Sequence, residues 1–339
     1  MAQGSRKRRF TQPRVVISRC IEFEPVRYDG GIIPSREVAR LKPYIEFLPV
    51  CPEVEIGLGI PRETIRIVRT DGDDHLIQPS TGRDVTREMQ TFCTRFLDGI
   101  PPVDGFILKN RSPTSGINGV RIYPSAQPSA PVAYGPGFFG GEVLRRYPGY
   151  PIEDEGRLRN HRILDHFLTR IYTLADYRLV EEAGTIDALV GFHSHNKLLL
   201  MAHNQTGYQE LGRLVGSHTK QEESTDLIAR YRLLLVPTIA RAPTYAENIN
   251  VMLHSVGRFK HQLKSEEKAV FLDALESYRA GTGTLAGPKN ILKSWIARFG
   301  DEYLNEQTFF APYPDALMEY PAEETERGRD LWADFRKAP

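Results

Sequence analysis

The chain has 339 residues, a formal net charge of +1 at pH 7, and a composition of 40% hydrophobic and 26% charged residues. These values are typical of a globular protein long enough for two domains, and its apolar runs are far shorter than the about 18 residues of a membrane-spanning helix. The three cysteines are an odd number and widely spaced, which argues against a disulfide framework and favours a reducing, cytoplasmic location.

The N-terminus is strongly basic. Residues 1–21 contain six basic residues and no acidic one, and no apolar core follows MAQGSRKRRF, so a secretory signal is not predicted. A basic arm of this kind can neutralise the phosphates of a nucleic acid, and a disordered solubilising tail explains it equally well. We therefore expect residues 1–13 to form a flexible basic arm.

Three short apolar segments in the first half are predicted strands, at 15–17, 45–50 and 106–108. The second should stop at Pro52, because proline has no N–H for a strand ladder. Open parallel sheets bind ligands at the carboxyl ends of their strands, so three parallel neighbours would bring the side chains behind them to one edge. These side chains are Cys20, Cys51, Glu53, Ser112 and Ser115.

Further elements are predicted between and after these strands. A helix is expected near 35–42 and a strand at 65–68, whereas the polar stretch 70–82, with an exposed His75, is predicted to be a surface loop. Residues 85–97 have apolar side chains at helical spacing, and Cys93 on this face is predicted to be a small buried residue.

The stretch 135–140 matches the dinucleotide-binding pattern G-x-G-x-x-G on paper. It contains a proline, and no acidic residue follows a second strand about 20 positions later, so the pattern is weak. We predict instead a glycine-rich start to a helix near Gly141.

From Leu158 onward the apolar spacing is helical. Thr185 is a predicted N-cap, and Gly281 and Gly300 lie just past predicted helix ends. The helices are expected at 163–174, 186–202, 206–215, 223–235, 245–263, 265–280 and 291–299. The predicted fold is an α/β domain at 14–165, with an open, mostly parallel sheet and helices, followed by an all-α domain at 166–330.

Four motifs of the first half, VISRC, VRYDGG, VCPEVEIGLGIPRE and FILKNRSPTSG, resemble the thiouracil desulfidase (TudS-like) domain over about 15–158. Members of that family hold a 4Fe–4S cluster with three cysteines and leave one iron open for the sulfur of the substrate. The resemblance implies that Cys20 and Cys51 are two of the ligands. At the third position the family reads SPSCG and this chain reads SPTSG, which places Ser115 where a cysteine is expected.

The same resemblance implies roles for two more residues. Glu53, two positions from a ligand, would be the general base, and Ser112 would orient the substrate or a proton. Further pocket residues are predicted to be Arg27, Tyr28, Asp29, Arg62 and Lys109. For Asp29 and Arg62, a structural ion pair or a turn cap is an equally good interpretation. A serine is a harder ligand than cysteine and is much harder to deprotonate, so a cluster here should be labile or carry an external ligand.

Three motifs of the second half, LVGFHSHNKLLLMAHNQTGYQELGRLVG, NVMLHSVGRFK and YLNEQTFFAPYPDALM, resemble the YbgA-like domain, which is often fused behind the first one. The family tends to have a histidine at the place of Asn196, whereas here the histidine is His195. The residues predicted to contact RNA are His193, Lys197, His203, Tyr208, Arg258 and Lys260. An ordinary solvated helix surface is the alternative. A metal site is disfavoured because His193 and His195 point to different helix faces.

Two functions follow from these patterns. The first is an enzyme that hydrolytically removes sulfur from a thiolated pyrimidine, by resemblance 4-thiouridine in tRNA or free thiouracil, and yields the uracil or uridine and sulfide. The second is a cluster-free protein that binds RNA or a nucleotide and has lost the activity through Ser115. A structural partner of another protein is a third class, for which the sequence offers no positive feature.

Overall fold

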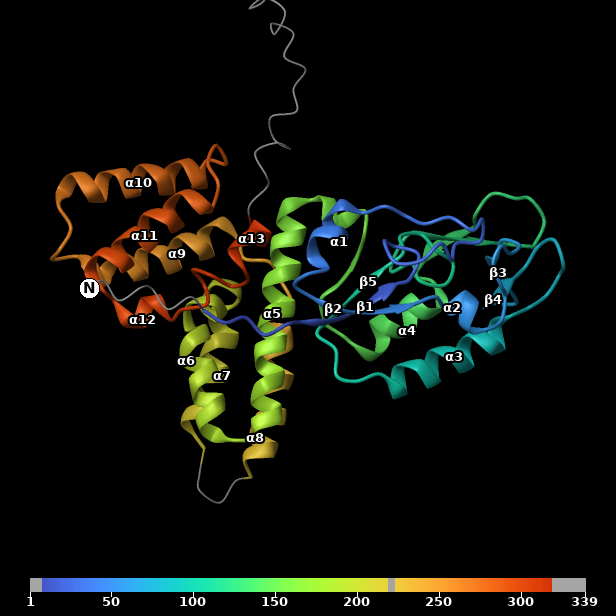
Figure 1. The fold of residues 1–339 in the computed structure, drawn as a ribbon, viewed down its shortest axis with the longest axis horizontal. Coiled ribbons are helices and arrows are strands. Elements are labelled where there is room, and N and C mark those ends of the chain that lie inside the picture. Colours follow the sequence, from blue (N-terminus) through green and yellow to red (C-terminus); the bar gives the residue numbers. More distant parts are fainter. Residues whose placement is uncertain (1–7, 219–222, 319–339) are drawn as a thin grey trace, which may run out of the picture.

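The computed structural model describes residues 8–218 and 223–318. The first half is built on a parallel sheet with the strand order β2-β1-β5-β8 (Figure 1). Its strands are β1 (Arg14–Ser18), β2 (Glu46–Val50), β5 (Gly105–Leu108) and β8 (Ile152–Asp154). Val15 of β1 pairs with Phe47 on one side and with Gly105 on the other. The prediction that the three apolar segments are parallel neighbours is therefore confirmed.

A second sheet, with the order β4-β3-β6-β7, lies beside the first. Its strands are β3 (Arg66–Thr70), β4 (Asp73–Ile77), β6 (Val120–Tyr123) and β7 (Ala133–Gly135). The prediction of a loop over 70–82 was wrong, because β3 and β4 form an antiparallel hairpin whose turn places Asp71 and Gly72 at positive φ. Only Leu76 of β4 is buried, so this edge strand has no apolar run that the sequence could reveal.

Helices cover both faces of the parallel sheet. On one face, α3 (Thr86–Gly99) and α4 (Phe138–Arg146) form a core with β1, β2 and β5 through side chains such as Phe92, Phe106 and Phe139. Cys93 of α3 belongs to this core, as predicted. The 135–140 stretch does lead into a helix, α4. Its Gly140 is required because a Cβ there would lie 2.3 Å from the carbonyl oxygen of Gly116.

The other face of the sheet is covered by α1 (Arg36–Leu41) and by the first turns of the long helix α5 (His161–Ala183). Phe167 and Ile171 of α5 are buried against β1 and β5, and a Cβ on Gly105 would lie only 2.8 Å from Ile171. The boundary expected between 165 and 166 therefore falls inside a helix that belongs to the core of the first half. Two short helices, α2 (Pro52–Glu55) and the 3₁₀ turn η1 (Arg157–Arg159), complete this half.

The rest of the described chain is helical, as predicted. Its helices are α6 (Ile186–His203), α7 (Gln205–Gly216), α8 (Ser224–Thr238), α9 (Tyr245–Val256), the 3₁₀ turn η2 (Gly257–Phe259), α10 (Ser265–Arg279), α11 (Ala286–Phe299), α12 (Glu302–Asn305) and α13 (Asp315–Met318). The Thr185 side chain accepts a hydrogen bond from the Ala188 N–H and caps α6, and Gly300 ends α11 in the left-handed conformation. None of the helices in the described ranges is long and apolar enough to cross a membrane.

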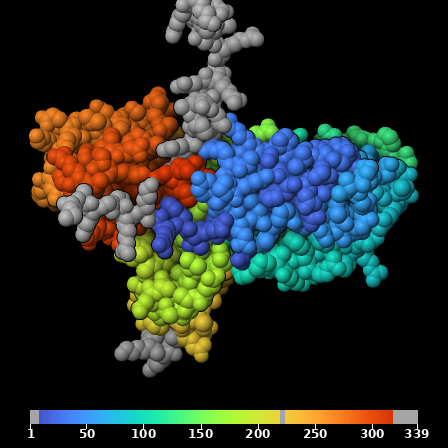
Figure 2. Space-filling model, in the orientation of Figure 1, coloured from blue at the N-terminus to red at the C-terminus, as the bar shows by residue number. Residues whose placement is uncertain are grey.

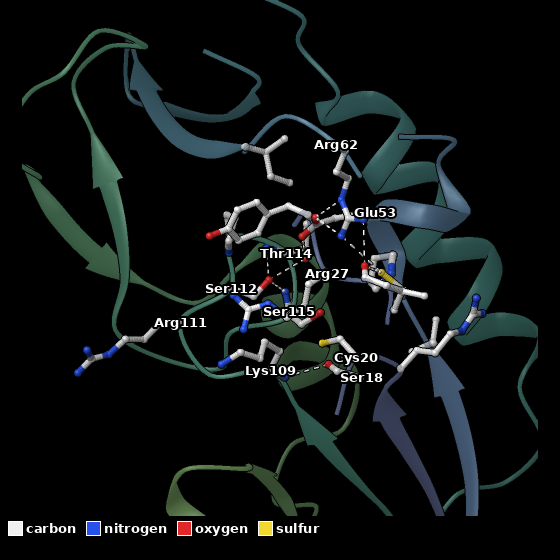
Figure 3. A pocket seen from close by; sticks show the side chains of 18 of the residues that line it. Ser18, Cys20, Arg27, Glu53, Arg62, Lys109, Arg111, Ser112, Thr114 and Ser115 are labelled. Atoms are coloured by element: carbon white, nitrogen blue, oxygen red, sulfur yellow. Dashed lines mark hydrogen bonds and ion pairs between the residues drawn. The ribbon is translucent and has the colours of Figure 1, made fainter. Parts of the chain in front are cut away.

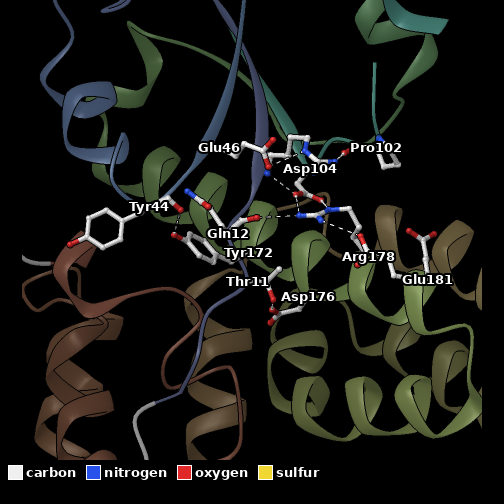
Figure 4. A network of polar contacts seen from close by, with 12 residues as sticks. Thr11, Gln12, Tyr44, Glu46, Pro102, Asp104, Tyr172, Asp176, Arg178 and Glu181 are labelled. Carbon is white, nitrogen blue, oxygen red and sulfur yellow. Dashed lines mark hydrogen bonds and ion pairs between the residues drawn. The ribbon is translucent and has the colours of Figure 1, made fainter. Parts of the chain in front are cut away.

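A polar network joins the two halves (Figure 4). The buried Asp104 carboxylate accepts hydrogen bonds from the Arg14 N–H (2.8 Å) and from Arg178 of α5 (3.2 Å). Residues 8–13 of the expected flexible arm lie across the helical half (Figure 2), where Arg8 pairs with Asp176 at 2.5 Å. Residues 1–7 lie outside the described part of the chain.

Candidate active site

A cavity of about 240 Å³ opens at the carboxyl edge of the parallel sheet (Figure 3). Of the ten site residues predicted in the first half, nine line it: Cys20, Arg27, Tyr28, Cys51, Glu53, Arg62, Lys109, Ser112 and Ser115. The exception is Asp29, whose carboxylate pairs with Arg27 at 3.1 Å and accepts a hydrogen bond from the Gly31 N–H at 3.0 Å. Asp29 thus has the turn-capping contact that was the alternative for this residue.

Two cysteines follow neighbouring strands and border this cavity. Cys20 comes two residues after β1, and Cys51 directly follows β2 because Pro52 starts α2 there. Burial raises the pKa of the Cys20 thiol to about 12, with the neighbouring Cys51 as the next cause, and burial also raises the pKa of Cys51. Both thiols therefore stay protonated at neutral pH unless a metal ion takes the place of the proton.

The turn after β5 places Ser115 at the same cavity. The Ser112 hydroxyl accepts hydrogen bonds from the N–H groups of Thr114 (3.2 Å) and Ser115 (3.1 Å), which fixes the turn. Gly116 allows the close packing behind it, since a Cβ there would lie 2.4 Å from Val120. Ser115 itself is 3% exposed, so its hydroxyl has a well-defined position.

Glu53 is held in place from two sides. Its Oε2 accepts from Nε (2.8 Å) and Nη2 (2.7 Å) of Arg62, and its Oε1 accepts from the Thr114 hydroxyl at 2.9 Å. Arg62 is in turn anchored to the backbone carbonyl groups of Val26 (3.0 Å) and Gly59 (3.1 Å). Arg62 therefore makes the structural ion pair considered for it, and the Glu53 carboxylate keeps a fixed orientation at the wall of the cavity.

Two further residues complete the site, Glu155 and Thr114, and neither had a predicted role. Lys109 binds Glu155, which follows the fourth strand β8, with 2.5 Å between Nζ and Oε1. Glu155 also accepts from the Asn110 N–H at 2.9 Å. Thr114 was missed in the same way, although it lies between two assigned serines. Both residues act through side-chain contacts that only the folded sheet creates.

The donor set at this edge determines which cofactor fits. Within residues 8–218 and 223–318, no group of three or more His, Cys, Asp or Glu side chains could hold a metal ion. Cys20, Cys51 and the Ser115 hydroxyl nevertheless border one cavity, which gives two soft sulfur donors and one hard oxygen donor. These residues fit an iron–sulfur cluster with a weaker third ligand.

Two of the residues predicted to contact RNA are buried and the others are partly or fully exposed. His193 is buried, with its Nδ1 at 2.9 Å from the Tyr231 hydroxyl and its ring stacked on Tyr208. His203 is also buried. Lys197 is half-buried, whereas Lys260 is exposed and Arg258 pairs with Asp301 on the surface. His193 and His203 therefore belong to the packing of the helical half.

Comparisons with known proteins match the two halves of the chain to two different families. The family model "2-thiouracil desulfurase" matches residues 15–155, and "Protein of unknown function (DUF1722)" matches residues 197–314. A solved structure, the [4Fe-4S]-dependent thiouracil desulfidase TudS, is 30% identical, with a TM-score of 0.35, covering 44% of this chain and 94% of that one.

The helical half has a curated relative. "Uncharacterized protein YbgA" of Escherichia coli (strain K12) is 30% identical over 157 residues, which are 46% of this chain and 93% of the relative. The chain therefore joins a domain of the 2-thiouracil desulfurase family to a helical domain of the family to which YbgA belongs.

Proposed function

We propose that the first half removes sulfur from a thiolated pyrimidine in an iron–sulfur-dependent reaction. The observation that carries this proposal is that Cys20, Cys51, Ser115 and Glu53 line one cavity at the carboxyl edge of a parallel sheet. The match to the 2-thiouracil desulfurase family over residues 15–155 supports the same reaction. The overall change replaces a C=S group by C=O, consuming water and releasing hydrogen sulfide.

The cluster would be held by Cys20, Cys51 and Ser115. When bound, a 4Fe–4S cluster with an open iron supplies a soft Lewis acid that prefers sulfur as its ligand. Glu53 takes a proton from the water that attacks the ring carbon, and the same proton can then neutralise the departing sulfur. The Thr114 hydroxyl and Arg62 orient the carboxylate for this transfer.

Other residues of the cavity bind and orient the pyrimidine. Arg27 and Tyr28 form one side of the cavity, with the guanidinium carbon 5.6 Å from the ring centre of Tyr28. The Lys109–Glu155 pair adds a polar wall without net charge. Ser112 uses its oxygen to hold the turn, so it acts on the substrate through the position of Thr114 and Ser115.

For the substrate, we infer 4-thiouridine in tRNA, or free thiouracil, and a cytoplasmic location. The support is the basic segment before β1, with Arg9, and the exposed Lys260 of the helical half. Free, buried thiols suit a reducing compartment. The alternative, a cluster-free RNA- or nucleotide-binding protein, is favoured by one observation only, the serine at the third ligand position.

The experiment compares two substrates with one anaerobically reconstituted protein. Free 2-thiouracil and tRNA that contains 4-thiouridine are each incubated with the full-length chain, and uracil, uridine and sulfide are quantified. We expect desulfuration of at least one substrate. A protein that holds iron and releases no sulfide from either substrate would contradict the proposed reaction, whereas one that binds tRNA and takes up no iron would favour the binding protein.

A further inference from the structure

A second and larger cavity, of about 670 Å³, lies in the helical half. It is enclosed by α5, α6, the start of α9 and the start of α11, together with the segment 309–317; Figure 1 shows these helices side by side. None of its lining residues belongs to the cavity at the sheet edge. It is therefore a separate candidate binding site, and three features indicate the chemistry of a ligand that would fit it.

The first feature is a positively charged helix start. The residues at the N-terminus of the 14-residue helix α11 line the cavity, and its N-cap, Leu285, has no side-chain capping hydrogen bond. Lys289 in the first turn also lines the cavity. Its Nζ lies 4.9 Å from the ring centre of Phe309, and the carboxylates of Asp165 and Asp315 are close enough to stabilise its charge. Helix N-termini with nearby lysines bind anionic groups such as phosphate.

The second feature is a buried histidine nitrogen without a partner. His203 lines the cavity and is 3% exposed. Its Nδ1 lies 2.9 Å from the Leu199 carbonyl oxygen, and since a carbonyl only accepts, Nδ1 carries the hydrogen. Nε2 of the neutral ring is then an acceptor, and it has no hydrogen-bond partner among the described residues. A ligand with a hydroxyl or a ring N–H would satisfy it.

The third feature is a set of aromatic side chains. Tyr245, Tyr278 and Phe309 line the cavity, and the rings of the two tyrosines are 4.8 Å apart. The Tyr278 hydroxyl accepts a hydrogen bond from the Asn248 amide at 3.0 Å, which leaves the amide oxygen of Asn248 as a further acceptor. Aromatic side chains of this kind pack against planar rings, and a nearby amide can hydrogen-bond to the polar edge of such a ring.

We propose that this cavity binds a nucleotide. The phosphate would lie at the start of α11 beside Lys289, the base would pack on the aromatic side chains, and a ribose hydroxyl or a ring N–H would donate to Nε2 of His203. The Asp165 carboxylate, which accepts from the Tyr313 hydroxyl at 2.5 Å, lines the same cavity and suits ribose hydroxyls. A free nucleotide and a nucleotide of an RNA chain share this chemistry.

The test measures binding of uridine monophosphate to the full-length chain by titration calorimetry, without iron and without a thiolated substrate. We expect Lys289→Gln to weaken this binding about tenfold or more, because a charge-assisted hydrogen bond to phosphate is lost. The matched control is Lys268→Gln on α10, which removes the same charge outside the cavity and should leave the affinity unchanged. Because the measurement needs no cluster, its failure would leave the proposed desulfuration untouched.

Changes to the ligand test the proposal without relying on a variant. Uridine monophosphate should bind more tightly than ribose 5-phosphate, which lacks the base, and more tightly than inorganic phosphate. Competition by tRNA would identify an RNA nucleotide as the source, and its absence a free nucleotide; both support the site. The proposal is overturned if the nucleotide does not bind at millimolar concentration, if ribose 5-phosphate binds equally well, or if both lysine variants lose affinity alike.

Discussion

At the scale of single residues, Ser115 lies in a buried turn, at the position where the resemblance to the TudS-like family implies a cysteine. Serine and cysteine differ by one atom, so Ser115→Cys should fit without repacking, while the soft thiolate matches iron far better. We expect the variant to take up more iron and sulfide per chain than the parent after anaerobic reconstitution. Ser129→Cys, which adds a thiol in an exposed loop, is the control. Equal gains in both variants would mean that the added iron is adventitious.

A second residue-scale prediction concerns Glu53. Glu53→Gln keeps the shape of the side chain and removes the base, so turnover of thiouracil should fall by about 10²–10⁴-fold with iron content unchanged. Glu55→Gln is the matched control, because Glu55 lies on the same short helix, pairs with Arg19 and does not itself line the cavity. A turnover of Glu53→Gln within twofold of the parent would show that another group takes the proton.

At the scale of elements, α5 connects the two halves because one helix serves two cores. Phe167 on its first turns is buried under the parallel sheet, whereas Leu179 near its end is 46% exposed. Phe167→Ala should lower the free energy of unfolding by about 3–5 kcal/mol, and Leu179→Ala by less than about 1 kcal/mol. Urea unfolding monitored by circular dichroism measures both. If Phe167→Ala costs no more than Leu179→Ala, α5 is not part of the first core.

The helical half should also lose stability in acid. Burial lowers the pKa of His166 to about 3 and those of His193 and His203 to about 4, below the value of about 6.5 in the unfolded chain. The unfolded state therefore binds more protons between about pH 6.5 and 4, so stability falls as pH falls through this window, by up to about 1.4 kcal/mol per pH unit for each histidine. His193→Gln should reduce this slope by about one proton. A slope that does not change in the variant would show that His193 titrates normally in the fold.

At the scale of the whole molecule, the sequence is informative where one residue type decides a local structure. Pro52 ends β2, Thr185 caps α6, and the residues behind three parallel strands do meet at one edge. The hairpin of β4 was missed because a polar edge strand has no apolar pattern. The partners Thr114 and Glu155 were missed because their roles exist only once distant strands align.

In the helical half, too, the sequence could not show which side chains the fold would bury. The sequence predicted His193 on a polar, RNA-contacting helix face, yet the fold buries His193 against Tyr231 and Tyr208. Periodicity alone did not separate the buried face of α6 from its exposed face, since α6 is apolar on most sides. The second cavity could not be predicted from the sequence either, because five separate segments of the chain form its lining.

The most direct test of the central claim is the fate of water oxygen in the reaction. The anaerobically reconstituted chain is incubated with 2-thiouracil in ¹⁸O-labelled water, and uracil is analysed by mass spectrometry beside the released sulfide. We expect one labelled oxygen in each uracil formed and one sulfide per uracil. Protein that carries iron but forms no labelled product from 2-thiouracil or from tRNA that contains 4-thiouridine, or that forms uracil without sulfide, would contradict hydrolytic desulfuration at the Cys20–Cys51–Ser115 edge.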